Sequence, residues 1–164
     1  MSVDHTEPVR PAAHAMRFAA LYAEIQQFYA HQMQLFDRHD SERWAATFTN
    51  GAVFVLPALD APVCGRAALA ASVRGNRERQ ERDGTQLRHW IGMLDVDVRP
   101  DGTLRTCAYA LVYATPRGGT PVVSRVFVMR DELVGRCGAW HVRHRVVSRD
   151  GLPEDGSAQG AGPL

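Results

Sequence analysis

Hydrophobic side chains recur at helical spacing in the first part of the chain. From Phe18 to Asp37 an apolar residue falls every three or four positions, and polar residues such as Glu24 and Gln34 lie between them. This spacing predicts one long amphipathic helix over residues 18–37, with one broad face directed at a core.

A short helix, a strand and a third helix are expected next. Asp40 or Ser41 can cap a helix from Glu42 to Phe48, whose inward face would hold Trp44 and Phe48. Turn and stop residues then indicate a strand over residues 52–56 and a helix over residues 66–80.

The period changes to that of strands after residue 86. Four β-rich runs cover residues 86–98, 104–115, 121–130 and 139–148. Glycine and proline fill the short connections, which favours antiparallel neighbours. Both faces of the runs carry apolar residues, so the sheet needs cover on both sides, from helices on one and from a partner subunit on the other. Helices followed by one curved antiparallel sheet form an α+β domain.

Length and composition limit the organisation of the chain. A chain of 164 residues suits one domain, expected over residues 16–150, with polar tails over residues 1–15 and 151–164. No signal peptide or membrane span is expected, because no apolar run is long enough. The three cysteines are scattered without a CxxC spacing, which predicts buried, reduced thiols and a cytoplasmic location.

Charge and motifs exclude several kinds of chemistry. The formal net charge is +1, so no basic excess is present to bind nucleic acid. All 19 basic residues are arginine, which excludes a Schiff-base or P-loop lysine. His141 and His144, three positions apart on a strand, are expected to face opposite sides and therefore not to share a metal ion. No metal or cofactor site is predicted, and dinucleotide-binding and nucleophile-elbow motifs are absent from the sequence.

Four local patterns, in order, resemble a known superfamily. They are Leu35-Phe36-Asp37 with Glu42-Arg43-Trp44, Asn50-Gly51-Ala52-Val53-Phe54, Leu87-Arg88-His89-Trp90-Ile91-Gly92, and Trp140-His141-Val142 through Arg145. Together they resemble the cone-shaped fold of the nuclear transport factor 2 superfamily over residues 18–150. Within that superfamily the chain is similar to SnoaL-like polyketide cyclases, scytalone dehydratase and the small subunits of ring-hydroxylating dioxygenases.

The strongest candidate for chemistry is His89. It lies in a predicted strand, on the same side as the apolar residues Leu87, Ile91 and Met93. Its side chain should therefore point into a core or a pocket. An imidazole that is partly shielded from water and has a carboxylate partner can act as a general base and acid. The alternative is a core histidine whose hydrogen bonds are satisfied.

Two further catalytic residues follow from the dehydratase resemblance. It implies that Asp37 orients the histidine in a closed pocket, although a capping aspartate at a helix end is the structural alternative. The dehydratase has a second pocket histidine on the next strand, where this chain has Tyr109. Its phenol could donate a hydrogen bond to an enolate oxygen, or Tyr109 could simply pack on the sheet.

A pocket between helices and sheet would suit a flat, hydrophobic, oxygenated substrate. Arg125 interrupts an apolar strand, so a buried ion pair or an anionic ligand group is expected beside it. The residues expected to bind substrate are Trp44, Phe54, Trp90, Met93, Arg125 and His144.

The leading functional hypothesis is a cofactor-independent acid–base cyclase or dehydratase of secondary metabolism. The alternatives are a non-catalytic subunit resembling the dioxygenase small subunit, and a small-molecule binding protein. The resemblance also implies a homodimer that forms through the open face of the sheet.

Overall fold

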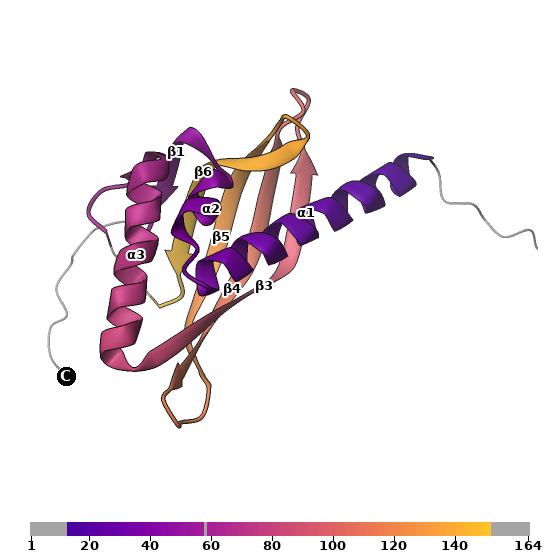
Figure 1. Ribbon diagram of the computed structural model, residues 1–164. Coiled ribbons are helices and arrows are strands. Elements are labelled where there is room, and N and C mark those ends of the chain that lie inside the picture. Colours follow the sequence, from indigo (N-terminus) through magenta and orange to yellow (C-terminus); the bar gives the residue numbers. More distant parts are fainter. Residues whose placement is uncertain (1–12, 58, 152–164) are drawn as a thin grey trace, which may run out of the picture.

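The computed structural model describes residues 13–57 and 59–151 as three helices on one side of a curved six-stranded sheet (Figure 1). The helices are α1 (Ala13–Asp37), α2 (Ser41–Ala46) and α3 (Gly65–Asp83). The strands are β1 (Phe48–Val55), β2 (Val63–Cys64), β3 (Thr85–Val98), β4 (Leu104–Pro116), β5 (Val122–Arg136) and β6 (Ala139–Arg149). The expected α+β fold is confirmed.

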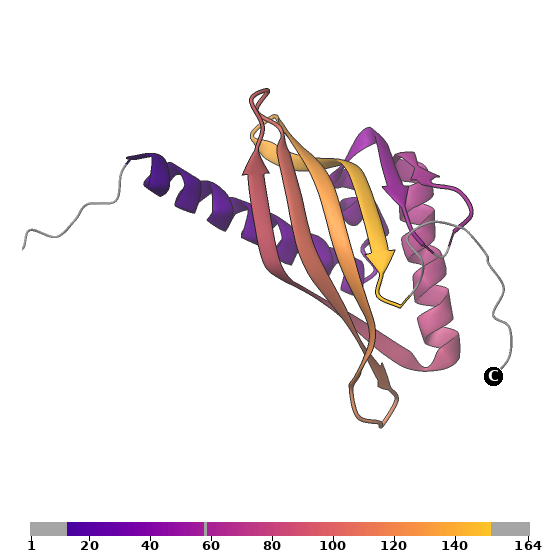
Figure 2. The same cartoon turned by 180° about the vertical axis from the view of Figure 1, so that it is seen from behind.

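The strand order is β2-β1-β6-β5-β4-β3, so the first strand, β1, lies next to the last strand, β6. All neighbours are antiparallel except β1 and β6, which run parallel. Seen from behind, the outer face of the sheet is not covered by any of the helices α1, α2 and α3 (Figure 2). None of the helices in the described part of the chain combines the length and apolar character needed to cross a membrane.

Two predicted boundaries in the helical part of the chain were wrong. Helix α1 begins at Ala13, inside the segment expected to be a tail, whereas residues 1–12 and 152–164 lie outside the described residues. Phe48 begins β1 instead of ending the second helix, because Thr47 closes α2 and Phe48 pairs with Val142 of β6. Trp44 and Phe48 still meet in the core, with ring centroids 4.7 Å apart.

The cysteines are also more accessible than predicted. Cys64 and Cys137 are exposed and Cys107 is half-buried, and none of them forms a disulfide. Cys64 lies at the N-terminal end of α3, and Cys137 occupies the tight turn between β5 and β6. Cys137 and Gly138 both have positive φ there, as a two-residue hairpin turn requires.

A buried ion pair lies within the core between α1 and the sheet. The Nε and Nη2 atoms of Arg145 donate to the two carboxylate oxygens of Asp131 over 2.8 and 2.6 Å. Arg145 is 2% exposed, and its guanidinium also lies over the rings of Phe48 and Phe54. Burial disfavours the charged guanidinium, but the adjacent Asp131 carboxylate and Tyr29 together outweigh this effect and raise the pKa of Arg145. Arg145 therefore has a structural role in the core.

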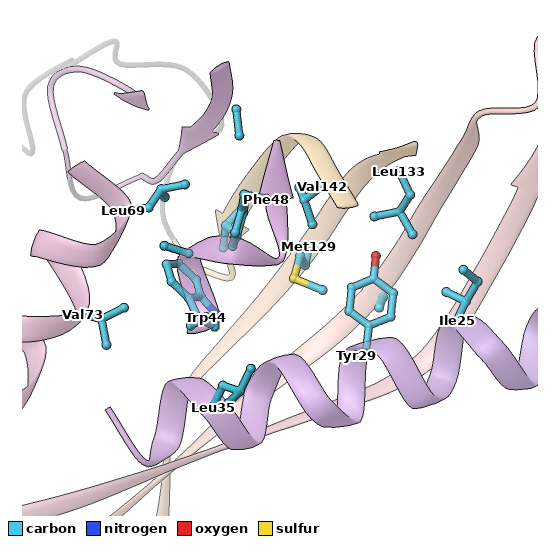
Figure 3. Packing of buried hydrophobic residues seen from close by; sticks show 14 of the residues in the cluster. Ile25, Tyr29, Leu35, Trp44, Phe48, Leu69, Val73, Met129, Leu133 and Val142 are labelled. Atoms are coloured by element: carbon cyan, nitrogen blue, oxygen red, sulfur yellow. The ribbon is translucent and has the colours of Figure 1, made fainter. Parts of the chain in front are cut away.

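Helix α1 is tied to this ion pair by two side chains. Tyr29 donates from its hydroxyl to Asp131 over 2.8 Å, and Gln32 accepts from Arg145 over 2.7 Å. Figure 3 shows the Tyr29 hydroxyl directed from α1 toward the sheet, among the apolar side chains of the core. Burial, and then the Asp131 carboxylate, raise the pKa of Tyr29 well above its ordinary value, so the phenol stays protonated and remains a donor.

Replacing Asp131 by alanine should lower the free energy of unfolding by about 3–5 kcal/mol, because Arg145 would stay buried without its counter-charge. Urea denaturation measures the change. Asp97→Ala is the matched control, since it removes an exposed pair with Arg99 and should have little effect. The double variant Asp131→Leu with Arg145→Met should recover most of the loss. A double variant as unstable as Asp131→Ala would contradict this account.

Candidate active site

Asp37 is the last residue of α1, and the way the helix ends directs its side chain. His39 adopts a left-handed backbone with φ of 59°, and the Asp40 amide donates back to the Leu35 carbonyl. Such an end stops the helix and turns the chain away from it. The Asp37 carboxylate therefore lies at the edge of the helix layer, next to β3.

His89 of β3 meets this carboxylate through two hydrogen bonds. The Nδ1 atom of His89 lies 2.7 Å from Oδ1 of Asp37, and the backbone N–H of His89 donates to Oδ2 over 3.1 Å. The two side chains are 17% and 10% exposed, respectively. Two donors to one carboxylate offset the negative end of the helix dipole, which by itself disfavours an acid at this position.

The geometry fixes which nitrogen of the imidazole can react. In the neutral ring, Nδ1 carries the hydrogen that Asp37 accepts, and Nε2 keeps a free lone pair. A carboxylate that holds Nδ1–H also stabilises the imidazolium formed when Nε2 takes a proton. The arrangement can therefore remove and return a proton at Nε2, provided that a substrate reaches that atom.

Aromatic side chains link the pair to the core. The ring of Phe36 packs edge-on to the His89 imidazole at 4.9 Å and lies 5.0 Å from Trp44. The ring centroids of Trp44 and Phe54 are 6.5 Å apart. Trp44 is buried and Phe54 half-buried, so both expected substrate residues lie on the inner side of the sheet, next to the layer that holds His89.

Arg125 lies on the same row of the sheet as His89. Val112 of β4 pairs with His89 on one side and with Arg125 of β5 on the other, so the three side chains share the inner face. The Cα atoms of His89 and Arg125 are therefore two strand spacings apart, about 10 Å. The buried ion pair expected for Arg125 was wrong, because the residue is exposed and forms no ion pair within the described residues.

Tyr109 and Trp90 face away from the pair. Trp90 pairs with Leu111, one position from the row of His89 and Val112, and Gly92 pairs with Tyr109, three positions from that row. Successive side chains on a strand point to opposite faces, so Tyr109 and Trp90 lie on the outer face, 51% and 61% exposed. The expectation that Tyr109 assists His89 and that Trp90 lines the same pocket is corrected.

Met93 and His144 are corrected because the strands are irregular. A register shift follows Gly92, where Met93 has φ of 51° and is 79% exposed instead of sharing the side of His89. Another shift interrupts β6, and His144 pairs with Glu132 on the outer face. Because of this shift, His141 and His144 do not face opposite sides of the sheet as expected, and both lie on its outer face. Even so, no group of three potential metal ligands occurs among the described residues.

Two cavities lie away from Asp37 and His89. The larger, about 420 Å³, is lined by the end of α3, the start of β3 and the β4–β5 turn, together with His39. Burial, followed by the guanidinium of Arg77, lowers the pKa of His39, which favours its neutral form. The smaller cavity, about 270 Å³, lies at the start of β1 beside the β5–β6 turn. Neither is lined by the candidate pair.

Comparison with known proteins now identifies the family. The sequence profile of the SnoaL-like domain matches residues 17–146. The chain belongs to the SnoaL-like family. Its fold is that of the nuclear transport factor 2-like superfamily, as the resemblance had implied.

Several solved structures are similar to this SnoaL-like chain. Aln2 from a Streptomyces species is 37% identical, with 85% of this chain and 94% of that chain covered and a TM-score of 0.74. ActVI-ORFA from Streptomyces coelicolor is 29% identical, with coverage of 82% and 98% and a TM-score of 0.75. A protein from Catenulispora acidiphila in complex with S-DNPA is 39% identical, with coverage of 80% and 95% and a TM-score of 0.69.

Solved structures with lower sequence identity share only the fold with this chain. A dioxygenase β subunit from Novosphingobium aromaticivorans is 18% identical, with coverage of 82% and 94% and a TM-score of 0.64. No curated protein matches this SnoaL-like chain.

The role of Asp131 as the buried partner of Arg145 was not predicted from the sequence. The strand was predicted to end at Arg130, which left Asp131 in a turn, whereas β5 continues to Arg136. The available signal was the alternation of Met129, Asp131 and Leu133, which places a carboxylate on the apolar side of a strand. Such a carboxylate needs a cationic partner, and Arg145 supplies it.

The neutral imidazole of His89 in this SnoaL-like protein should carry its hydrogen on Nδ1, because the Asp37 carboxylate accepts it. Nitrogen–proton correlation spectra, recorded where the ring is neutral, distinguish the two ring nitrogens. His31, which is exposed on α1, provides the reference for an unconstrained ring. In Asp37→Ala, His89 should become like His31. A native His89 with its hydrogen on Nε2 would contradict the assignment.

Proposed function

We propose that this protein is a cofactor-independent acid–base enzyme that acts on a polyketide-type or aromatic small molecule, as a cyclase or dehydratase. The observation that carries the proposal is the 2.7 Å contact between Asp37 and Nδ1 of His89, which leaves Nε2 available. Membership of the SnoaL-like family supports it, as does the similarity to Aln2 and ActVI-ORFA. The complex of a 39% identical relative with S-DNPA supports a small-molecule ligand.

The proposed reaction needs only proton transfer. Nε2 of His89 removes a proton from a carbon next to a substrate carbonyl, and the electron pair of that C–H bond moves onto the carbonyl oxygen as an enolate. Asp37 stabilises the imidazolium that results. In cyclisation, the enolate carbon attacks a second carbonyl carbon of the substrate, and the alkoxide that results takes the proton back from Nε2. In dehydration, the enolate re-forms the carbonyl as the C–O bond of a β-hydroxyl breaks, and the proton leaves with that hydroxyl as water. Cyclisation and dehydration therefore use the same two residues.

Arg125 is proposed to bind an anionic part of the substrate. It lies on the inner face, with its Cα about 10 Å from the Cα of His89 across the sheet. Its guanidinium is exposed and can form two parallel hydrogen bonds with a carboxylate. Phe54, which is half-buried, is proposed to supply an apolar wall on the same side of the sheet, whereas Trp44 is 1% exposed and belongs to the core. The His89 side chain is 17% exposed, and the substrate is proposed to reach Nε2 through this exposed part.

The non-catalytic alternatives do not require the Asp37–His89 contact. A packing subunit resembling the dioxygenase small subunit depends on a larger partner for its chemistry. A binding protein needs a pocket but no base with a free lone pair. The paired hydrogen bonds to one carboxylate therefore favour the enzyme.

Replacing His89 by glutamine should lower kcat by about 10²–10⁴-fold, because the base is lost while a polar side chain of similar size remains. Mass spectrometry follows turnover of S-DNPA and of other polyketide-type compounds by the native protein and the variants. Asp37→Asn should also lower kcat, whereas Arg125→Gln should mainly raise KM for acidic substrates.

His31→Gln is the matched control for that experiment, since His31 is an exposed histidine on α1 away from the sheet. Circular dichroism and thermal unfolding establish that each variant is folded. A folded His89→Gln variant with native turnover would refute the mechanism. Copurification with a larger chain, without turnover by the native protein, would favour the subunit alternative.

The outer face of the sheet is proposed to pair two copies of the chain. Trp90, Tyr109 and Val123 are about half or more exposed on this face, which none of the helices α1, α2 and α3 covers (Figure 2). An exposed apolar patch of this kind is typical of an interface. A second copy would bury these side chains. It would thereby cover the second apolar face of the sheet, as expected from the sequence.

Native mass spectrometry should therefore find twice the chain mass. A charge at Trp90 would be buried unpaired in the interface, so Trp90→Arg should shift the protein to the monomer. Val98→Arg is the control, because Val98 is also exposed on β3 but lies on the other face. A dimer that tolerates Trp90→Arg and dissociates in Val98→Arg would place the interface elsewhere.

A further inference from the structure

A basic cavity lies apart from the candidate active site. It measures about 270 Å³ and is lined by Thr49, Asn50, Arg66, Arg136, Cys137 and His141. These residues come from the start of β1, the start of α3 and the β5–β6 hairpin. Figure 1 shows the first turn of α3 beside β1. The cavity shares no lining residue with the Asp37–His89 pair.

The charges around this cavity have one sign. Arg66 and Arg136 both line it, together with His141, and its lining contains no carboxylate. Two arginines in the wall of one cavity favour an anion between them, because like charges repel each other. A planar guanidinium is also the side chain best suited to bind phosphate or carboxylate oxygens through paired hydrogen bonds.

Arg66 is held in place by the backbone. Its Nε atom donates to the Phe48 carbonyl over 2.7 Å, and its Nη2 atom donates to the Ala46 carbonyl over 3.1 Å. These bonds fix the guanidinium at the cavity wall, so little side-chain entropy would be lost when it binds a ligand. No protein partner occupies Nη1 among the described residues.

His141 adds a buried polar atom with an unused hydrogen-bonding capacity. Its Nδ1 atom is buried and has no hydrogen-bond partner among the described residues. Buried polar atoms almost always have a partner, so this unpaired atom, on a residue of the cavity wall, favours a ligand or a water molecule beside His141. The hydroxyl of Thr49 and the amide of Asn50 offer uncharged donors in the same wall.

We propose that this cavity binds an oxyanion of the phosphate type. Arg66 and Arg136 neutralise its charge, and His141, Thr49 and Asn50 complete its hydrogen bonds. A water molecule in the liquid occupies about 30 Å³, so the cavity can accommodate a phosphate group together with several waters or with part of an attached organic group. This site is independent of the proposed acid–base reaction.

Isothermal titration of the full chain with inorganic phosphate and with phenyl phosphate tests the proposal. The native protein should bind at least one of them saturably, at one site per chain. Arg136→Gln should weaken binding about tenfold or more, because it removes a charged pair of hydrogen bonds. Arg105→Gln is the control: it removes an equal charge from an exposed arginine on β4, outside the cavity, and should bind as the native protein does.

The two probes distinguish the sources of the anion. Tighter binding of phenyl phosphate would assign the site to a phosphate ester, and equal or weaker binding would assign it to free phosphate. His141→Phe should also weaken binding, whereas His89→Gln should not, which separates this site from the proposed active site. Failure of both probes to saturate the native protein would overturn the proposal, as would native affinity in Arg136→Gln.

Discussion

The buried pair of Arg145 and Asp131 organises the interior of this SnoaL-like protein. Two charges removed from water are tolerated only if their hydrogen bonds are satisfied, and here the contacts come from three elements. Arg145 lies on β6, Asp131 lies on β5, and Tyr29 and Gln32 reach them from α1. The pair therefore joins the long helix to the centre of the sheet and fixes their relative position.

That position determines where the candidate catalytic carboxylate lies. Tyr29 and Asp37 belong to the same helix, eight residues and about 12 Å apart along its axis. A helix held rigidly at Tyr29 and Gln32 carries Asp37 to the β3 edge of the sheet, where it meets His89. The stabilising network and the proposed proton-transfer pair are thus connected through α1, although they share no hydrogen bond. A shift of the helix by one turn would separate Asp37 from His89.

The sheet assigns different roles to its two faces. The inner face holds the ion pair, the aromatic core and the row of His89, Val112 and Arg125, while the outer face exposes Trp90 and Tyr109. Proton transfer and substrate binding are proposed for the first face, and pairing of two copies for the second. Aromatic residues that look alike in the sequence therefore belong to different functions, according to the side of the strand from which they project.

Local patterns in the sequence predicted the helices and the long strands in their order, and the resemblance that these patterns carry implied the family and the Asp37–His89 pair. Hydrophobic periodicity and turn residues are local properties, and His89 lies in a regular part of β3 where alternation predicts its side correctly. The reach of α1 back to Ala13 and the extension of β5 past Arg130 were not predicted, because element ends depend on packing partners distant in the chain.

Tertiary structure alone decided the rest of the site. The irregular registers after Gly92 and within β6 moved Met93 and His144 out of the expected pocket, and no local signal in the sequence marks them. The register between strands also showed that Tyr109 is on the outer face and that Arg125 shares the row of His89. Pairing between strands is set by contacts across the whole sheet, so which side chains meet in one site is a property of the assembled fold.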